Sequence, residues 1–196
     1  MPDNSHSTTL SASIQKWKNG SLQSTINDEL AVEEPLEIRV HGQSLAITMR
    51  TPGHDEELAA GFLQTEGIIK NQADLVEITR CNGGKHNQGE NRLNISLSPN
   101  LEVDLESLSR HVFASSRCGL CGKATIESAK QNFDPIESNV RVLPRTITSL
   151  PALLRNAQPT FDQTGGLHAA AVFDAKGKIV VCREDVGRHN AVDKVV

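Results

Sequence analysis

Two cysteines, Cys118 and Cys121, stand three residues apart in the segment SSRCGLCGK, with Arg117 before the pair and Lys123 after it. A thiolate is both a nucleophile and a metal ligand, and neighbouring cations or a helix N-terminus favour it by lowering the thiol pKa. The glycines within and after the pair leave the backbone around it accessible. The pair therefore indicates sulfur chemistry or metal ligation.

Spacing and surroundings favour thiol chemistry over zinc without deciding between them. A closed zinc site needs four ligands, but Cys81 and Cys182 are solitary and the seven histidines are scattered. A Cys₃His site assembled from distant segments stays open. Four cysteines are too few for a disulfide scaffold, and thioredoxin-like exchange expects the pair directly after an early strand. Burial as a small apolar side chain suits Cys182, in the run KIVVC, better than Cys118.

Composition narrows the class of protein. Of the 196 residues, 37% are hydrophobic and 22% charged, which is typical of a globular chain. The net charge is −4 and the isoelectric point is near 6.0, which argues against non-specific binding of nucleic acid. The first 20 residues do not resemble a secretory signal, and no apolar run is long enough to span a membrane. We expect a cytoplasmic protein, because reducing conditions there keep thiols free.

The first half of the chain predicts a small α+β portion over residues 30–110. Residues 1–29 are rich in Ser, Thr and Asn and are expected to form a mobile tail. Alternating apolar residues over 36–47 predict a hairpin that turns at Gly42 and Gln43. The pattern of 54–68 predicts a helix capped by Gly67. Two more strands are expected over 74–81 and 92–98, and a second helix over 101–110.

The second half of the chain predicts strands and helices in a different succession. Residues 111–134 are expected to form the Cys-x-x-Cys loop and a short helix that stops before Pro135. Residues 164–182 read as a strand, a turn and a strand, and Asn190 is placed to cap a final helix. Strands interleaved with helices predict an α/β or α+β fold with three layers.

Five segments together resemble the FdhD family of formate dehydrogenase accessory sulfurtransferases. They are, in order, EEPLEIRVHG, MRTPGHDEELAAGFLQTEGII, SSRCGLCGKATIE, TGGLHAAAVF and REDVGRHNAVDKVV, and the resemblance runs from about Leu30 to the last residue. It implies a cytoplasmic homodimer with an α/β/α cytidine-deaminase-like domain after a smaller N-terminal portion. Residues 135–196 would belong to that domain and would leave it incomplete at its C-terminal end.

The resemblance also implies a reaction. Cys118 would accept sulfur as a persulfide from a cysteine desulfurase, and Cys121 would be the second thiol. The sulfur would go to bis(molybdopterin guanine dinucleotide) molybdenum cofactor, bound as cargo, before that cofactor activates formate dehydrogenase. No tightly bound metal and no nucleic acid polymer are expected. Two alternatives stay open: a chaperone that binds the cofactor without moving sulfur, and a zinc-binding protein with a deaminase fold.

Polar residues near the C-terminus are the expected contacts of the cofactor's phosphates. Arg188, His189 and Asn190 stand at the start of the predicted last helix, and His168 starts a strand that could line the same cleft. Helix capping and exposed charge explain such a cluster equally well. Deamination is disfavoured, because zinc deaminases need a His-x-Glu motif and His189 and His168 are each followed two residues later by Ala.

Overall fold

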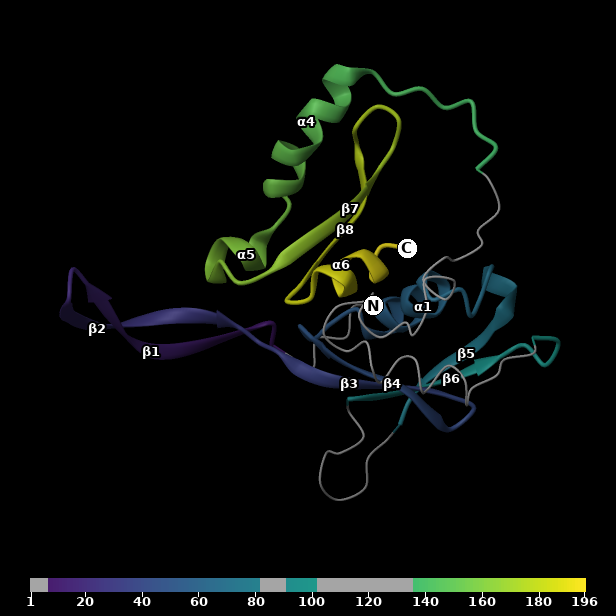
Figure 1. The fold of residues 1–196 in the computed structure, drawn as a ribbon, viewed down its shortest axis with the longest axis horizontal. Helices are drawn as coiled ribbons and strands as arrows, with labels where there is room; N and C mark the ends of the chain where they lie inside the picture. The colour runs from purple at the N-terminus through teal and green to yellow at the C-terminus, as the bar shows by residue number, and fades with distance from the viewer. Residues whose placement is uncertain (1–6, 82–90, 102–135) are drawn as a thin grey trace.

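The computed structural model describes residues 7–81, 91–101 and 136–196 and has a mixed α+β fold, which confirms the predicted class (Figure 1). Its strands form a four-stranded sheet and two separate two-stranded sheets. The elements in chain order are β1 (Thr9–Lys18), β2 (Ser21–Ala31), β3 (Glu34–Val40), β4 (Gln43–Arg50), α1 (Asp55–Thr65), the 3₁₀ turn η1 (Gln72–Asp74), β5 (Leu75–Arg80), β6 (Arg92–Leu97), α4 (Pro144–Arg155), α5 (Pro159–Thr164), β7 (His168–Phe173), β8 (Ile179–Asp185) and α6 (Arg188–Asp193).

The four-stranded sheet has the order β4-β3-β6-β5 and is antiparallel except for the parallel pair β3–β6. Helix α1 packs on this sheet (Figure 1). The core between them is made of side chains that are at most 7% exposed: Leu36, Ile38, Val40, Leu45, Ala46, Leu58, Ala59, Leu63, Ile68, Ile69, Leu93, Ile95 and Leu97. The predicted strands over 36–47, 74–81 and 92–98 are therefore confirmed.

The β3–β4 turn lies one residue earlier than expected. His41 and Gly42 both have positive φ, 48° and 80°, as a two-residue hairpin turn of the mirror-image type requires. The strand register then shifts between Ile38 and Arg39, so that Leu45 and Ala46 are both buried. As a result Ile47, which alternation alone would place inward, is 47% exposed.

Helix α1 forms as its sequence predicts. Its end is a Schellman motif, in which Gly67 has φ 72° and donates to the carbonyl of Gln64, while Ile68 donates to that of Leu63. Its start is held by a buried salt bridge: Arg50, at the end of β4, donates from Nε and Nη2 to the two carboxylate oxygens of Asp55 at 2.9 and 3.0 Å. The helix is thus fixed to the strand that precedes it.

Residues 9–31 form an antiparallel hairpin, so the prediction of a mobile tail over 1–29 was wrong for this part of it. Leu10, Ile14 and Ile26 supply the alternation of a strand pair, and Asn19-Gly20 is a strong signal for a hairpin turn. Both turn residues have positive φ, 53° and 76°. The hairpin extends away from the rest of the molecule as an arm (Figure 1).

The last third contains the predicted β7–β8 hairpin, with α4 and α5 beside it and α6 between it and α1 (Figure 1). Helix α6 is preceded by Gly187 as its N-cap, so Asn190 is its third residue and not the predicted cap. It packs tightly on α1, because a Cβ atom built on Gly61 would lie 1.8 Å from the carbonyl oxygen of Asp193. Among the described residues no helix is long and apolar enough to cross a membrane.

Candidate functional site

Asp185, the fully buried last residue of β8, is the centre of a polar cluster. Its Oδ1 accepts hydrogen bonds from the Gly187 backbone N–H at 2.8 Å and from Asn190 Nδ2 at 2.9 Å. Its Oδ2 accepts from the Thr51 backbone N–H at 3.1 Å and pairs with Lys194 Nζ at 2.7 Å. A buried carboxylate is tolerated when it is paired and hydrogen-bonded in this way. The cluster joins the end of β4 to β8 and α6.

The partners of Asp185 make further contacts to β4. Lys194 Nζ donates to the Thr51 carbonyl at 2.9 Å. Asn190 donates from Nδ2 to the Met49 carbonyl at 2.8 Å and accepts the Thr48 hydroxyl at 3.1 Å. Both the amide oxygen and the amide nitrogen of Asn190 are therefore hydrogen-bonded within the protein, and these bonds hold α6 against β4.

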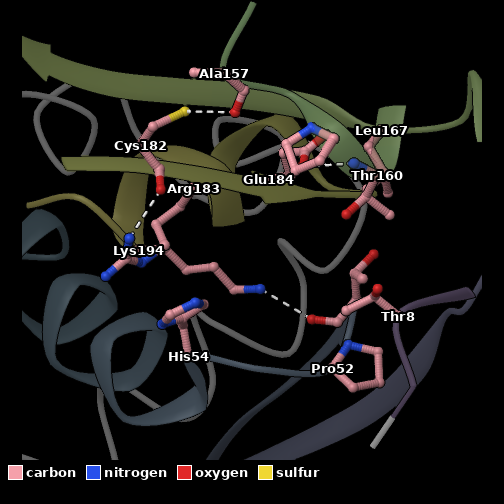
Figure 2. Close-up of a pocket in the computed structure, with 12 residues that line it drawn as sticks. Thr8, Pro52, His54, Ala157, Thr160, Leu167, Cys182, Arg183, Glu184 and Lys194 are labelled. Carbon is pink, nitrogen blue, oxygen red and sulfur yellow. Dashed lines mark hydrogen bonds between the residues drawn. The ribbon is translucent and has the colours of Figure 1, made fainter. Parts of the chain in front are cut away.

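A cavity of about 260 Å³ lies beside this cluster, where the β4–α1 connection meets β8 and the start of α5. Figure 2 shows Cys182, Glu184 and Thr160 along one wall, with His54 and Pro52 opposite. The lining mixes polar and apolar groups and comes from segments far apart in sequence: Thr8, Thr51, Pro52, His54, Ala157, Pro159, Thr160, Leu167, Cys182, Arg183, Glu184 and Lys194.

One side of the cavity carries an ion pair with a histidine beside it. Arg183 donates from Nε and Nη2 to the two carboxylate oxygens of Glu57 at 2.5 and 2.7 Å, and His54 Nδ1 lies 3.2 Å from Glu57 Oε2. The hydrogen bond from Arg183 lowers the pKa of Glu57. Burial, followed by the positive charge of Arg183, lowers the pKa of His54. The imidazole at this wall is therefore neutral near pH 7 and can both donate and accept a hydrogen bond.

Glu184 anchors the opposite wall. Its carboxylate accepts the backbone N–H groups of Thr160 at 3.0 Å and Phe161 at 2.7 Å. These are the second and third residues of α5, whose orphan donors need an acceptor. Gln158, at the N-cap, makes no side-chain cap. Glu184, which lies 24 positions from Thr160 in sequence, therefore caps α5 and fixes it at the edge of the cavity.

The Cys182 thiol faces the cavity but is poorly suited to attack. Its Sγ lies 3.7 Å from the Ala157 carbonyl, to which it donates (Figure 2). Burial, and then the negative charge of Glu184, raises its pKa. A thiol with a raised pKa holds little thiolate at neutral pH. The interpretation of Cys182 as a packing residue therefore fits its surroundings.

The predicted site residues have three different outcomes. Asn190 is buried and bonded to Met49 and Asp185. Cys118 and Cys121 lie outside the described residues. Arg188 and His189 are exposed in the first turn of α6, and His168, also exposed, is paired in register with Asp185 three residues before Arg188. None of these three lines the cavity. In the described ranges, no group of three or more His, Cys, Asp or Glu side chains is arranged to hold a metal ion.

Residues 31–196 match the sequence pattern of the FdhD/NarQ family. The chain belongs to this family. The match covers both the four-stranded sheet and the cluster around Asp185, so the two parts that meet at the cavity are features of one FdhD/NarQ unit.

Curated relatives of this FdhD/NarQ chain carry the name sulfur carrier protein FdhD. The protein of Streptomyces coelicolor is 49% identical over 179 residues, covering 88% of this chain and 63% of the relative. The protein of Mycobacterium tuberculosis is 42% identical over 178 residues, covering 86% and 64%. The chain thus spans less than two thirds of the length of these relatives.

The fold has a solved counterpart. A crystal structure from Desulfotalea psychrophila, of a protein described as a formate dehydrogenase accessory protein, matches with a TM-score of 0.69 and 24% sequence identity. The match covers 96% of this chain and 66% of the other. At this identity the likeness shows a shared fold.

Sequence reasoning missed the residues that join the two halves of the site. The sequence patterns did not single out Thr51, His54 or Arg183. The contact between Thr51 and Asp185 spans 134 positions. The segments MRTPGHDEE and REDVGRHNAVDK are both dense in polar residues, but density alone does not tell which side chain meets which.

Proposed function

We propose that this chain is a sulfur carrier that accepts persulfide sulfur on Cys118 from a cysteine desulfurase. The observation that carries the proposal is the Cys-x-x-Cys pair between Arg117 and Lys123, in a chain whose curated relatives are named sulfur carrier proteins. The activity, substrates and partners of the whole protein are part of the proposal. The chemistry suits the cytoplasm, where thiols stay reduced.

Loading is a thiol exchange. The Cys118 thiolate attacks the outer sulfur of the donor's persulfide and breaks its S–S bond. The donor leaves as a cysteine thiolate, and Cys118 carries the extra sulfur as its own persulfide. Flanking cations raise the thiolate fraction of such a cysteine near neutral pH. Cys182 lacks this advantage, since burial raises its pKa.

Release involves the second thiol. The Cys121 thiolate attacks the inner sulfur of the Cys118 persulfide, forms a disulfide and expels the outer sulfur as hydrosulfide. The outer sulfur is reduced while the two cysteines are oxidised, so a dithiol reductant must reset the pair before the next cycle.

The recipient of the sulfur is the molybdenum cofactor bis(molybdopterin guanine dinucleotide), which then activates formate dehydrogenase. A crystal structure of the same fold is described as a formate dehydrogenase accessory protein, which supports this destination. Two of the predicted contacts, Arg188 and His189, are exposed at the start of α6. The third, His168, is also exposed and is paired in the β7–β8 register with Asp185, which precedes Arg188 by three residues. We include these three as contacts for the cofactor's phosphates and omit Asn190, whose side chain is used internally.

Intact-mass analysis tests the proposal directly. After incubation with a cysteine desulfurase and cysteine, the chain should gain one sulfur atom that a reductant removes. Cys118→Ala should abolish the gain, whereas Cys121→Ala should load sulfur and transfer it poorly. Cys182→Ala is the matched control and should load like the parent chain. Unchanged loading of Cys118→Ala would reject the assignment, and a Cys118→Ser variant that still supports formate dehydrogenase would favour a cofactor chaperone.

A further inference from the structure

The cavity between the β4–α1 connection, β8 and the start of α5 has the size of a small metabolite. Its volume of about 260 Å³ is below that of sites for drug-sized ligands, which are roughly 300–1,000 Å³. Its apolar lining comes from Pro52, Ala157, Pro159 and Leu167. What the cavity can bind is therefore decided by the polar groups of the lining that still have bonding capacity.

Lys194 and Thr51 supply donors. The Lys194 side chain is 1% exposed and lines the cavity, and its Nζ lies 2.7 Å from Asp185 Oδ2 and 2.9 Å from the Thr51 carbonyl oxygen. An ammonium has three N–H donors, so one is left over. The Thr51 hydroxyl oxygen accepts the Val186 backbone N–H at 3.1 Å and keeps its own proton. In the part of the chain that the structure describes, neither this proton nor the third N–H of Lys194 has an acceptor, so both are available to a carboxylate.

Glu184 supplies an acceptor with an uncompensated charge. Its carboxylate accepts two backbone N–H groups of α5, and each oxygen keeps a further acceptor site. The other carboxylates beside the cavity, those of Glu57 and Asp185, are each paired with a cation. Within the described ranges Glu184 has no such partner. The net charge at the cavity is therefore negative, which favours an ammonium group and disfavours a simple anion such as phosphate.

His54 is brought to the cavity by an uncommon backbone conformation. It precedes α1 as the N-cap with φ 57° and ψ 32°, in the left-handed region, and its side chain makes no cap hydrogen bond. Conformations of this kind in residues other than glycine cluster at functional sites. Its Nδ1 lies 3.2 Å from the Glu57 carboxylate and carries the proton of the neutral ring, so Nε2 is left as a second acceptor.

We propose that this cavity binds a small α-amino acid as its zwitterion. Lys194 and Thr51 bind the carboxylate, Glu184 and His54 bind the ammonium group, and the apolar lining contacts a short side chain. Figure 2 shows Lys194, Glu184 and His54 around the same space. The exposed residues assigned to the cofactor's phosphates line no part of it. The inference does not depend on the sulfur-carrier role.

Calorimetric titration of the 196-residue chain with L-alanine tests the proposal, because alanine has both charged groups and an unreactive side chain. We expect one L-alanine to bind per chain with a Kd below about 1 mM. Propionate lacks the ammonium group and ethylamine lacks the carboxylate, so each should bind at least about tenfold more weakly. An absence of saturable L-alanine binding up to about 10 mM, or equally tight binding of propionate, would overturn the proposal.

A variant that fills the cavity locates the binding. Thr160 lines the cavity and its hydroxyl makes no hydrogen bond to another described residue, so Thr160→Leu adds volume without breaking a contact. It should weaken L-alanine binding at least about tenfold. Gln163→Leu, at an exposed position of the same helix, is the matched control and should bind like the parent chain. Parent-like binding by Thr160→Leu would place the ligand elsewhere and reject the site.

Glu184→Gln tests which group recognises the ammonium. It should weaken L-alanine binding at least about tenfold and leave propionate binding no weaker, so that the preference for alanine over propionate is lost. Loss of affinity for both ligands by the same factor would show that Glu184 only supports α5 and would contradict its proposed role. GDP is the competitor in a last titration and should not displace L-alanine. Displacement would assign the cavity to the nucleotide end of the cofactor and overturn the proposal, whereas sulfur loading at Cys118 is measured separately.

Discussion

Two of the antiparallel hairpins, β1–β2 and β3–β4, are built by the same local rules but are buried to opposite extents. Both β1–β2 and β3–β4 turn through two residues of positive φ, Asn19-Gly20 and His41-Gly42. In β3 the inward residues Leu36, Ile38 and Val40 are at most 1% exposed, whereas three apolar residues of the arm are 36–62% exposed: Leu10, Ile26 and Leu30.

Turn chemistry and alternation specify a hairpin, while the elements that pack against it decide its stability. Hairpin β3–β4 is covered by α1 and extended by β6, and its far end is tied to Asp55 and Asp185 through Arg50 and Thr51. The arm has none of these supports. The same substitution should therefore have different consequences in the two hairpins.

The largest expected effect comes from removing the carboxylate that ties β4 to β8. Asp185→Ala leaves Lys194 buried without its ion-pair partner, which should lower the free energy of unfolding by about 3–5 kcal/mol. Asp162→Ala is the control, because its ion pair with Arg155 is exposed; its loss should cost less than about 1 kcal/mol. Chemical denaturation measures both. Equal losses would mean that the cluster is not a structural anchor.

The next test compares the two hairpins directly. Ile38→Ala removes a side chain that is 1% exposed and should cost about 2–5 kcal/mol of global stability. Ile14→Ala, in the half-buried middle of the arm, should change the stability of the dilute chain by less than about 1 kcal/mol. Matched urea titrations at low protein concentration provide the measurement. A large loss in Ile14→Ala would show that the arm is already part of the body's cooperative unit.

A third prediction concerns the α1–α6 contact, which has no counterpart in the arm. Burial raises the pKa of Asp193 to about 6. The hydrogen bond from the Thr65 hydroxyl, at 2.8 Å, opposes this rise in pKa, and the charges of Glu66 and Asp185 add to it. Folding therefore favours the protonated acid, and the parent chain loses stability as the pH rises from about 4 through 6. Asp193→Asn stays neutral and keeps an acceptor for Thr65.

The advantage of Asp193→Asn should thus be small below pH 4 and reach about 2–3 kcal/mol above pH 6. Denaturation at a series of pH values from 4 to 8 measures the difference between the two proteins. A difference that does not change with pH would show that Asp193 is ionised at no cost in the folded state.

The smallest effects are expected at the two turns. Gly42→Ala and Gly20→Ala each force a side chain into the left-handed region, which costs about 1 kcal/mol locally. Only Gly42→Ala should lower the global melting temperature, because the arm can open without unfolding the body. Amide hydrogen exchange would separate the two: faster exchange confined to β1 and β2 is expected for Gly20→Ala. A global increase in that variant would remove the distinction between the hairpins.

The elements that the sequence predicted well are those specified by short-range chemistry. The pattern around Leu58 and Leu63 and the glycine at 67 define α1, and the β7–β8 strands follow from their alternation. The arm was missed although Asn19-Gly20 marks its turn, because its polar composition was taken for a tail. The register shift that buries both Leu45 and Ala46 depends on packing with β3 and leaves no trace in the periodicity.

Long-range polar contacts could not be predicted from the sequence, for a different reason. The bonds from Thr51 to Asp185 and from Arg183 to Glu57 join positions 134 and 126 residues apart. Asn190 was predicted as a helix cap and cofactor contact, but its amide is enclosed between β4 and Asp185. A polar residue at a helix start looks the same in sequence whether it binds a ligand or another part of the chain.

Localising one labelled sulfur atom shows whether Cys118 is the residue that carries the sulfur. The chain is loaded by a cysteine desulfurase with ³⁵S-labelled cysteine, blocked with an alkylating reagent and digested, and the label is assigned to a peptide. We predict about one reductant-releasable sulfur per chain, on the peptide that contains Cys118, and none in Cys118→Ala. Label on the Cys81 or Cys182 peptide, or undiminished label in Cys118→Ala, would contradict it.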